Sequence, residues 1–336
     1  CGRDVPHRPF VTRATPAPGG GTDRHRANHF HSELMPAPVG FHLSRQAPCK
    51  ELVASQERYW NRQSPLAPPV ERADSPSPRT AWTAGRWVLS NWCDMHVKRV
   101  ARCRRHKPGG SRLVLIGDSI LEMLALNVSY SHALKSFPVT WRKEPLHLAV
   151  GGDQSQHALW RLQQGELSSS MADDASIVYL IHIGTNNLGN YMGPGPVHSP
   201  AETHAGVHRL IEHVLDASKG RVVVTSILPR YDTPRPWVTG EWLRCTSRAC
   251  GTSAGGGARR RTFLPAISEV NERLLASSDQ LARKHGTSRL LYVDCGHGMR
   301  TREGQSLLYD GVHPSPAGLA MMIGCVHEAM RSRKWL

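Results

Sequence analysis

From residue 113 onward the sequence alternates short apolar runs with longer amphipathic stretches, and this alternation constrains the fold more than any other feature. The apolar runs, rich in β-branched residues, are Leu113–Ile116, Leu146–Val150, Ile177–Ile183, Arg221–Ile227 and Arg289–Val293. The stretches with helical spacing are Ile120–Leu126, Ser155–Leu167, Pro200–Ser218, Leu264–His285 and Pro316–Arg331. Buried strands that alternate with helices are typical of a parallel sheet with helices on both faces, so we predict an α/β fold.

The chain before this region has a different character. Residues 1–84 are rich in Pro, Gly, Ser, Arg and His and show no sustained apolar periodicity, which predicts a mostly disordered extension. Apolar residues then recur at helical spacing from Trp87 to Cys103, so we expect a helix that Pro108 and Gly109 end. The predicted organisation is a basic N-terminal extension over 1–84 and one folded domain over 85–336.

The formal net charge of +15 is unevenly placed along the 336 residues. Residues 1–110 hold 18 Lys and Arg against 8 Asp and Glu, and the segment Arg230–Arg261 holds seven Arg against two acidic residues. This second segment overlaps an Arg- and Gly-rich insertion over 231–262. A protein that recognises nucleic acid carries its charge on the folded face that docks, so we predict a solvated basic tail and no specific nucleic-acid partner. No apolar run approaches the roughly 18–20 residues of a transmembrane helix, so none is expected.

The eight cysteines form no Cys-x-x-Cys pair, and no histidines stand beside them at zinc-site spacing. Cys295 and Cys325 lie in apolar surroundings, which predicts two buried free thiols. A disulfide between Cys245 and Cys250 is neither predicted nor excluded. This cysteine usage favours a reducing compartment, and hence the cytoplasm. The series His204, His208 and His213 is expected on a solvated helix face rather than at a metal site.

Two small motifs follow the first two predicted strands. Ser119 stands at the turn from a strand into a helix, where its N–H and the helix dipole favour negative charge. Its plainer interpretation is an ordinary helix N-cap. Gly152 lies in a Gly-Gly turn, where a backbone N–H can approach a ligand closely. We expect its neighbour Asp153, or Ser155, only to cap the following helix.

Polar residues also follow the third and fifth predicted strands. Asn186 can supply a side-chain hydrogen bond to an oxyanion, whereas Asn187 is expected only to form a turn. Asp310 and His313 lie three residues apart before the last helix, which Ser315 is expected to cap. In such a loop the aspartate orients the imidazole, which acts as general base to a nucleophile.

These residues fall at successive carboxyl ends of one inferred sheet, where functional groups of such folds gather, and they form a complete set of roles. Ser119 is the predicted nucleophile, His313 its base, and Asp310 orients that base. The N–H groups of Ser119 and Gly152 and the Asn186 amide form a predicted oxyanion hole. This set is suited to acyl transfer through a tetrahedral intermediate.

The four groups of residues around Ser119, Gly152, Asn186 and His313 resemble the conserved motifs of the SGNH (GDSL-type) hydrolases, which are named for their Ser, Gly, Asn and His. Within that superfamily, the stretch from Val150 to Leu167 resembles the catalytic subunits of platelet-activating-factor acetylhydrolase Ib, as do Trp92, His96, Cys103 and Leu228-Pro229-Arg230. The resemblance implies a flavodoxin-like three-layer sandwich with a five-stranded parallel sheet. It also implies the same catalytic roles, no metal or other cofactor, and a homodimer.

The sequence departs from that subgroup at His147 and Ala149, in a longer stretch between Ser119 and Gly152, and in the 231–262 insertion. These departures can reshape the pockets for the acyl group and the leaving group, so the resemblance does not identify the substrate. The leading hypothesis is a serine esterase that cleaves short acyl esters of a lipid or small molecule. The alternatives are a carbohydrate O-acetyl esterase, an acyltransferase on the same site, and a non-catalytic interaction protein.

Overall fold

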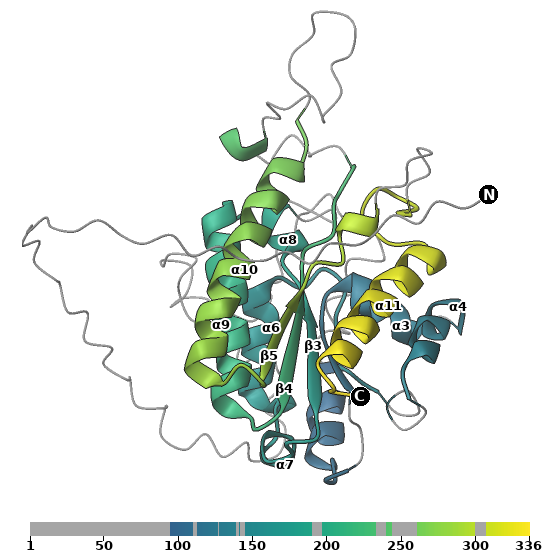
Figure 1. Ribbon diagram of the computed structural model, residues 1–336, viewed down its shortest axis with the longest axis vertical. Coiled ribbons are helices and arrows are strands. Elements are labelled where there is room, and N and C mark those ends of the chain that lie inside the picture. Colours follow the sequence, from purple (N-terminus) through teal and green to yellow (C-terminus); the bar gives the residue numbers. More distant parts are fainter. Residues whose placement is uncertain are drawn as a thin grey trace, which may run out of the picture. The chain divides into compact units, whose positions relative to one another are not determined.

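Five parallel strands form one sheet, in the order β2-β1-β3-β4-β5, in a computed structural model of the chain (Figure 1). The strands are β1 (Leu113–Gly117), β2 (Leu146–His147), β3 (Val178–His182), β4 (Arg221–Thr225) and β5 (Leu290–Val293). This order is flavodoxin-like, which confirms the fold expected from the alternating runs and from the family resemblance.

The structure describes residues 95–109, 113–126, 128–138, 141, 145–189, 197–232, 240–243, 261–299 and 307–336. They belong to one compact unit. The extension over 1–84, most of the 231–262 insertion, and both Cys245 and Cys250 lie outside the described residues. Residues 95–104 are helical, as the spacing before Cys103 predicts.

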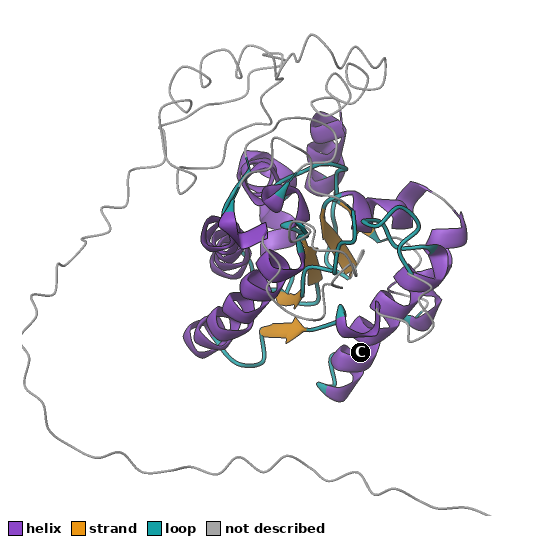
Figure 2. Ribbon diagram, turned by 90° about the horizontal axis from the view of Figure 1, so that it is seen from above, coloured by secondary structure: helices purple, strands orange, loops and turns teal. Residues whose placement is uncertain are grey.

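Each face of the sheet is covered by its own set of helices. Along β1, Val114 and Ile116 belong to one apolar core, and Leu113 and Leu115 belong to the other, because strand side chains alternate between faces. The helices of the first core are α6 (Ser155–Arg161), α9 (Pro200–Ala217) and α10 (Leu264–His285). Those of the second core are α3 (Ser119–Leu126) and α11 (Pro316–Ser332). Figures 1 and 2 show these helices on opposite sides of the sheet.

Local sequence signals start two of the long helices, α9 and α11. The Ser199 hydroxyl accepts a hydrogen bond from the Glu202 N–H at the start of α9, and Pro200 follows at the first helical position. Ser315 caps α11 in the same way through the Gly318 N–H, as the sequence predicts. A polar cap followed by proline satisfies the otherwise unpaired N–H groups of the first turn.

The edge strand β2 is shorter than predicted. Beyond His147 the N–H groups of Leu148 and Val150 still bond to β1, at 2.8 and 3.0 Å from the carbonyls of Leu115 and Gly117. On the outer side, the carbonyl of Ala149 accepts a 2.7 Å hydrogen bond from the Arg99 guanidinium. A side chain on the helix over 95–104 therefore covers this part of the sheet edge, where another strand could otherwise pair.

Short helical segments join the main elements, and the sequence predicts helix at only one of them, Leu162–Glu166, which lies within the stretch Ser155–Leu167. They are α4 (Val128–Ser131), α7 (Ser169–Ala172), α8 (Thr185–Leu188), the 3₁₀ turns His132–Ser136, Glu241–Leu243 and His297–Met299, and a wide turn at Leu162–Glu166. Among them α8 matters most for the site, because it carries Asn186 and Asn187 where the sequence predicts only a turn.

The prediction of two free thiols at Cys295 and Cys325 is wrong. Their sulfurs form a disulfide, with Cα atoms 5.9 Å apart, which joins the end of β5 to α11. Both residues lie in apolar segments 30 positions apart, and only the packing of α11 against the sheet brings them together. Among the described residues, Cys103 is a buried free thiol. The argument for a reducing compartment therefore loses its support.

None of the helices that the structure describes is both long enough and apolar enough to cross a bilayer.

Gly117 ends β1 where there is no room for a side chain. A Cβ at this position would lie 2.3 Å from the backbone carbonyl oxygen of His182 on β3. We expect Gly117→Ala to lower the free energy of unfolding by about 2 kcal/mol or more, because two paired strands would have to separate. Denaturant unfolding measures this loss. The matched control is Gly324→Ala on α11, where no atom lies within 4 Å; it should raise stability by about 0.5–1 kcal/mol. Equal stability of Gly117→Ala and wild type would contradict the prediction.

Candidate active site

Ser119 and His313 meet at the carboxyl-end edge of the sheet. Ser119 is the first residue of α3, directly after β1 and Asp118, and His313 lies in the loop before α11. The Ser119 Oγ lies 2.8 Å from the His313 Nε2, although the two residues are 194 positions apart. The hydroxyl donates to this nitrogen when His313 is the tautomer that carries its proton on Nδ1.

Asp310 selects that tautomer. Its Oδ2 lies 2.6 Å from the His313 Nδ1, and its Oδ1 accepts hydrogen bonds from the N–H groups of Val312 and His313 at 2.9 and 2.7 Å. Partial burial alone would raise the pKa of Asp310, but the hydrogen bonds from the His313 N–H and ring and from Val312 outweigh it and lower that pKa. The carboxylate therefore stays charged and accepts from the imidazole.

The loop that carries Asp310 and His313 is closed on itself. Leu308 and Pro314 form an isolated antiparallel bridge, and the Ser315 N–H donates to the Leu307 carbonyl at 2.7 Å. The ring of Tyr309 stacks on that of His313, with centroids 5.9 Å apart, and 62% of this tyrosine is exposed. Tyr309 therefore covers one face of the imidazole and presents an aromatic surface to solvent beside it.

Gly152 lies in a tight turn against Ser119. The Asp153 N–H donates to the Val150 carbonyl at 3.1 Å, and Gly152 has φ of +76° while Gly151 does not have positive φ. These features define a type II turn with glycine at its third position. A Cβ on Gly151 would lie 3.6 Å from the Ser119 Cβ, so the turn packs directly beside the serine.

Asn186 is joined to the same turn. Its side-chain amide donates a 3.0 Å hydrogen bond to the carbonyl of Asp153, which leaves the second amide N–H for another acceptor. The Gln154 amide donates in return to the Asn186 carbonyl at 2.9 Å. Asn187 is buried and accepts from the Ser155 N–H at 3.0 Å, so it ties α8 to α6. The structure thus gathers Ser119, Gly152, Asn186, Asp310 and His313 at one edge of the sheet.

A buried chain of charges lies behind the Gly151-Gly152 turn, in place of the helix cap predicted at Asp153. Asp153 accepts from Nη2 and Nε of Arg161 at 2.8 and 3.1 Å, and Arg161 also donates to Glu166. Glu166 pairs in turn with the His96 Nδ1 at 3.0 Å. The helix cap is Gln154 instead, paired with His157 in a capping box. The missed signal is the presence of Arg161 and Glu166 within an otherwise apolar stretch.

Arg230 and the residue after it connect α8, which carries Asn186, to the loop that carries His313. Its Nη1 donates to the carbonyls of Thr185 and Gly189 at either end of α8, at 2.8 and 2.9 Å, and its Nη2 pairs with Asp232 at 2.7 Å. The next residue, Tyr231, donates its N–H to the carbonyl of Gly311 in the histidine loop at 2.8 Å. Sequence reasoning singled out Arg230 only through the family resemblance, since a lone arginine after a strand carries no signal of its own.

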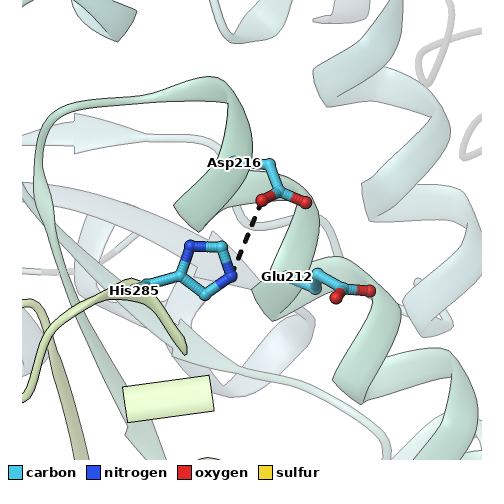
Figure 3. Close-up of side chains that lie close together, drawn as sticks. All are labelled: Glu212, Asp216 and His285. Atoms are coloured by element: carbon cyan, nitrogen blue, oxygen red, sulfur yellow. Dashed lines mark ion pairs between the residues drawn. The ribbon is translucent and has the colours of Figure 1, made fainter. Parts of the chain in front are cut away.

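A group of possible metal ligands lies at the other end of the sheet. Glu212 and Asp216 on α9 and His285 at the end of α10 have ligand atoms within 4.8 Å of one another (Figure 3). The ammonium of Lys284 lies 2.8 Å from Glu212 and 3.9 Å from Asp216, so a protein cation already neutralises these carboxylates. His204, predicted on a solvated helix face, is half-buried, and its Nε2 lies 3.0 Å from the Ser277 Oγ.

The sequence profile of the GDSL-like lipase/acylhydrolase family matches residues 115–321, more than half of the chain. The chain belongs to this family. The match confirms the resemblance to the SGNH hydrolases. It contains Ser119, Gly152, Asn186, Asp310 and His313.

Individual relatives agree with the resemblance to the acetylhydrolase Ib group. Platelet-activating factor acetylhydrolase IB subunit alpha1 of Bos taurus is 30% identical over 151 residues, 43% of this chain and 54% of the relative. Subunit alpha2 of Gallus gallus is 27% identical over 151 residues, 43% of this chain and 55% of the relative. The chain thus spans about half the length of the curated relatives that it matches. A crystal structure of a GDSL-like lipase from Bacteroides thetaiotaomicron is 19% identical and covers 71% of this chain and 97% of its own, with a TM-score of 0.48.

The ion pairs of Arg161 should contribute strongly to stability. Arg161→Met would leave two buried carboxylates, Asp153 and Glu166, without their counter-charge, so we expect a loss of about 3–5 kcal/mol in the free energy of unfolding. Arg273→Met is the matched control, because its pair with Glu269 is exposed and should contribute less than about 1 kcal/mol. Urea unfolding of both variants measures the difference, and equal losses would contradict this assignment.

Asp118 should make stability depend on pH. Burial raises its pKa from 3.8 to about 7, one oxygen accepts from the Ile120 N–H, and the other has no hydrogen-bond partner. The folded state therefore keeps a proton that the unfolded state releases, and stability falls as pH rises from about 4 to about 7. Asp118→Asn removes this cost, so its stability relative to wild type should increase by roughly 1–3 kcal/mol between pH 5 and pH 8.

Thermal unfolding at both pH values measures this effect. The exposed Asp279→Asn on α10 is the control and should keep the wild-type pH dependence. An identical pH dependence of Asp118→Asn and wild type would show that Asp118 is ionised in the folded protein throughout this range.

Proposed function

We propose that the protein is a serine esterase that hydrolyses short-chain, acetyl-like esters of a lipid or small molecule. Ser119 is the nucleophile, His313 the general base, and Asp310 the group that orients the base. The observation that carries the proposal is the continuous hydrogen-bonded series from Ser119 Oγ through the imidazole to Asp310, at 2.8 and 2.6 Å. Family membership supports the ester-cleaving class, and the name of the acetylhydrolase relatives supports a small acyl group.

The reaction proceeds in two steps that the geometry permits. The Ser119 Oγ attacks the ester carbonyl carbon while its proton passes to the His313 Nε2. The carbonyl oxygen becomes an oxyanion, which accepts hydrogen bonds from the N–H groups of Ser119 and Gly152 and from the Asn186 amide. The ester C–O bond then breaks, and His313 gives its proton to the departing alkoxide, which leaves an acyl-enzyme on Ser119.

Water completes the cycle. It attacks the acyl carbon while His313 takes one of its protons, and a second tetrahedral intermediate forms in the same oxyanion hole. The intermediate collapses as the Ser119 Oγ leaves and recovers a proton from His313. The products are a carboxylic acid, an alcohol and the unchanged enzyme. Asp310 stays ionised throughout and stabilises the imidazolium that forms in each step.

The backbone supports the proposed oxyanion hole. In the described part of the chain, the N–H groups of Ser119 and Gly152 have no hydrogen-bond acceptor. Ser119 begins α3, so its N–H also lies at the positive end of the helix dipole. A developing negative charge beside Ser119 would therefore meet two free donors and a favourable dipole.

Hydrolysis of aryl esters of graded acyl length tests the proposal. Wild type should hydrolyse acetyl esters faster than longer ones, and Ser119→Ala should lower kcat by at least about 10³-fold, because the acyl-enzyme cannot form. Ser268→Ala on the exposed face of α10 is the matched control and should keep full activity. Circular dichroism verifies that each variant is folded.

Each outcome separates the proposal from its alternatives. Preference for long acyl chains would keep the mechanism and exclude the short-chain substrate. Faster release of acetate from acetylated sugars than from acetylated lipids would favour the carbohydrate esterase. Absence of Ser119-dependent turnover on all these esters would overturn the proposal and leave the acyltransferase or the non-catalytic protein.

A further inference from the structure

The Gly151-Gly152 turn has three backbone donors, and two of them are in use. The Asp153 N–H donates within the turn to the Val150 carbonyl. The Gly151 N–H donates to the Glu122 Oε2 at 2.9 Å. The N–H of Gly152 has no acceptor among the described residues. The turn therefore offers one free donor, which is the donor that an oxyanion beside Ser119 requires.

Glu122 is placed to control this turn. It lies in the first turn of α3, three residues after Ser119, and its N–H donates to the Asp118 carbonyl at 3.0 Å. A Cβ on Gly151 would lie 2.8 Å from the Glu122 Oε2 and 3.6 Å from the Ser119 Cβ. Carboxylate, turn and serine thus pack against one another, and the carboxylate holds the peptide N–H that precedes the proposed oxyanion donor.

We propose that Glu122 is a positioning residue for the oxyanion hole: its carboxylate holds the Gly151 N–H and so orients the Gly152 N–H toward the reacting carbonyl oxygen. This inference rests on the proposed esterase function and assigns a residue to it. Among the described residues, Glu122 forms no hydrogen bond to the Ser119 hydroxyl or to His313, so it acts through the backbone of the turn.

The charges around Glu122 are consistent with this role. Burial raises its pKa, and the hydrogen bond from the Gly151 N–H and the charges of Arg99 and Arg161 oppose that rise. Asp153 acts in the same direction as burial, and Asp118 is a further nearby carboxyl group. What the turn needs from position 122 is a hydrogen-bond acceptor rather than a negative charge, because an anion here would oppose the oxyanion. A neutral acceptor of the same length can therefore replace the carboxylate.

Steady-state kinetics of Glu122 variants on an acetyl aryl ester test the inference. Glu122→Leu should lower kcat by about tenfold to a hundredfold with KM changed less than about twofold, because an oxyanion hydrogen bond forms only in the transition state. Glu122→Gln should restore kcat to within about threefold of wild type, because its amide oxygen accepts from the Gly151 N–H. Glu269→Leu on the surface of α10 is the matched control and should behave as wild type.

Hydrogen exchange of the Gly151 amide, measured by NMR, reports on the contact with Glu122 and does not require catalysis. Val39-Gly40 and Val150-Gly151 are the two Val-Gly pairs in the sequence, so labelling Val with ¹³C at the carbonyl and Gly with ¹⁵N gives two linked amide signals. Gly40→Ala removes one of them and so assigns the Gly151 amide. Its exchange with solvent should be slow in wild type and in Glu122→Gln, and at least about tenfold faster in Glu122→Leu. If Glu122→Leu does not fold, Glu122→Ala takes its place, because its short side chain avoids placing an apolar group against the turn and leaves a space that water can enter.

The outcomes distinguish this inference from the proposed function. Wild-type kcat in a folded Glu122→Leu, or equal losses in the Leu and Gln variants, would overturn the role of Glu122 while Ser119-dependent hydrolysis by wild type kept the esterase. Wild type without Ser119-dependent hydrolysis would instead overturn the esterase and with it the catalytic role of Glu122. Unchanged Gly151 exchange in the Leu variant would overturn the positioning contact itself.

Discussion

The site depends on a hydrogen bond of 2.8 Å between Ser119 and His313, which joins the start of α3 to a loop almost two hundred residues later. Neither residue holds the other in place by itself. Ser119 is fixed because β1 is an interior strand and Gly117 allows it to pack closely against β3. His313 is fixed because its loop closes through the Leu308 and Pro314 bridge and α11 packs on the sheet immediately after it. The parallel sheet is thus the common frame of both groups.

The glycine turn on the other side of Ser119 is held by charge rather than by apolar packing. Asp153, Arg161, Glu166 and His96 form a buried series that runs from the turn to the helix over 95–104. Burial of charges is costly unless each finds its partner, so a misplaced turn would leave several of them unpaired. This dependence makes the series a means of specifying one position for the turn. Arg230 does the same for α8, because its guanidinium bonds to both ends of that helix.

Much of the arrangement at the candidate site could be predicted, because its residues follow strands with a clearly apolar composition. Ser119, Gly152, Asn186, Asp310 and His313 stand immediately after such runs, or just before a helix with a clear cap, and parallel strands bring those points to one edge. Residues that support them were not predictable in the same way. Glu122, Arg161 and Arg230 lie on helices or beyond a strand end, where a charged side chain is equally consistent with exposure to solvent.

The sequence by itself determined the class of fold, the position of most strands and helices, and the types of residue at the strand ends, because hydrophobic periodicity and capping are local properties. Only the tertiary structure decided which side chains meet. It joined Cys295 to Cys325, buried Arg161 between two carboxylates, made Gln154 rather than Asp153 the helix cap, and turned the Asn186 segment into a short helix. These outcomes depend on distances between segments far apart in the chain, and such distances are set by how helices pack on the sheet rather than by neighbouring residues.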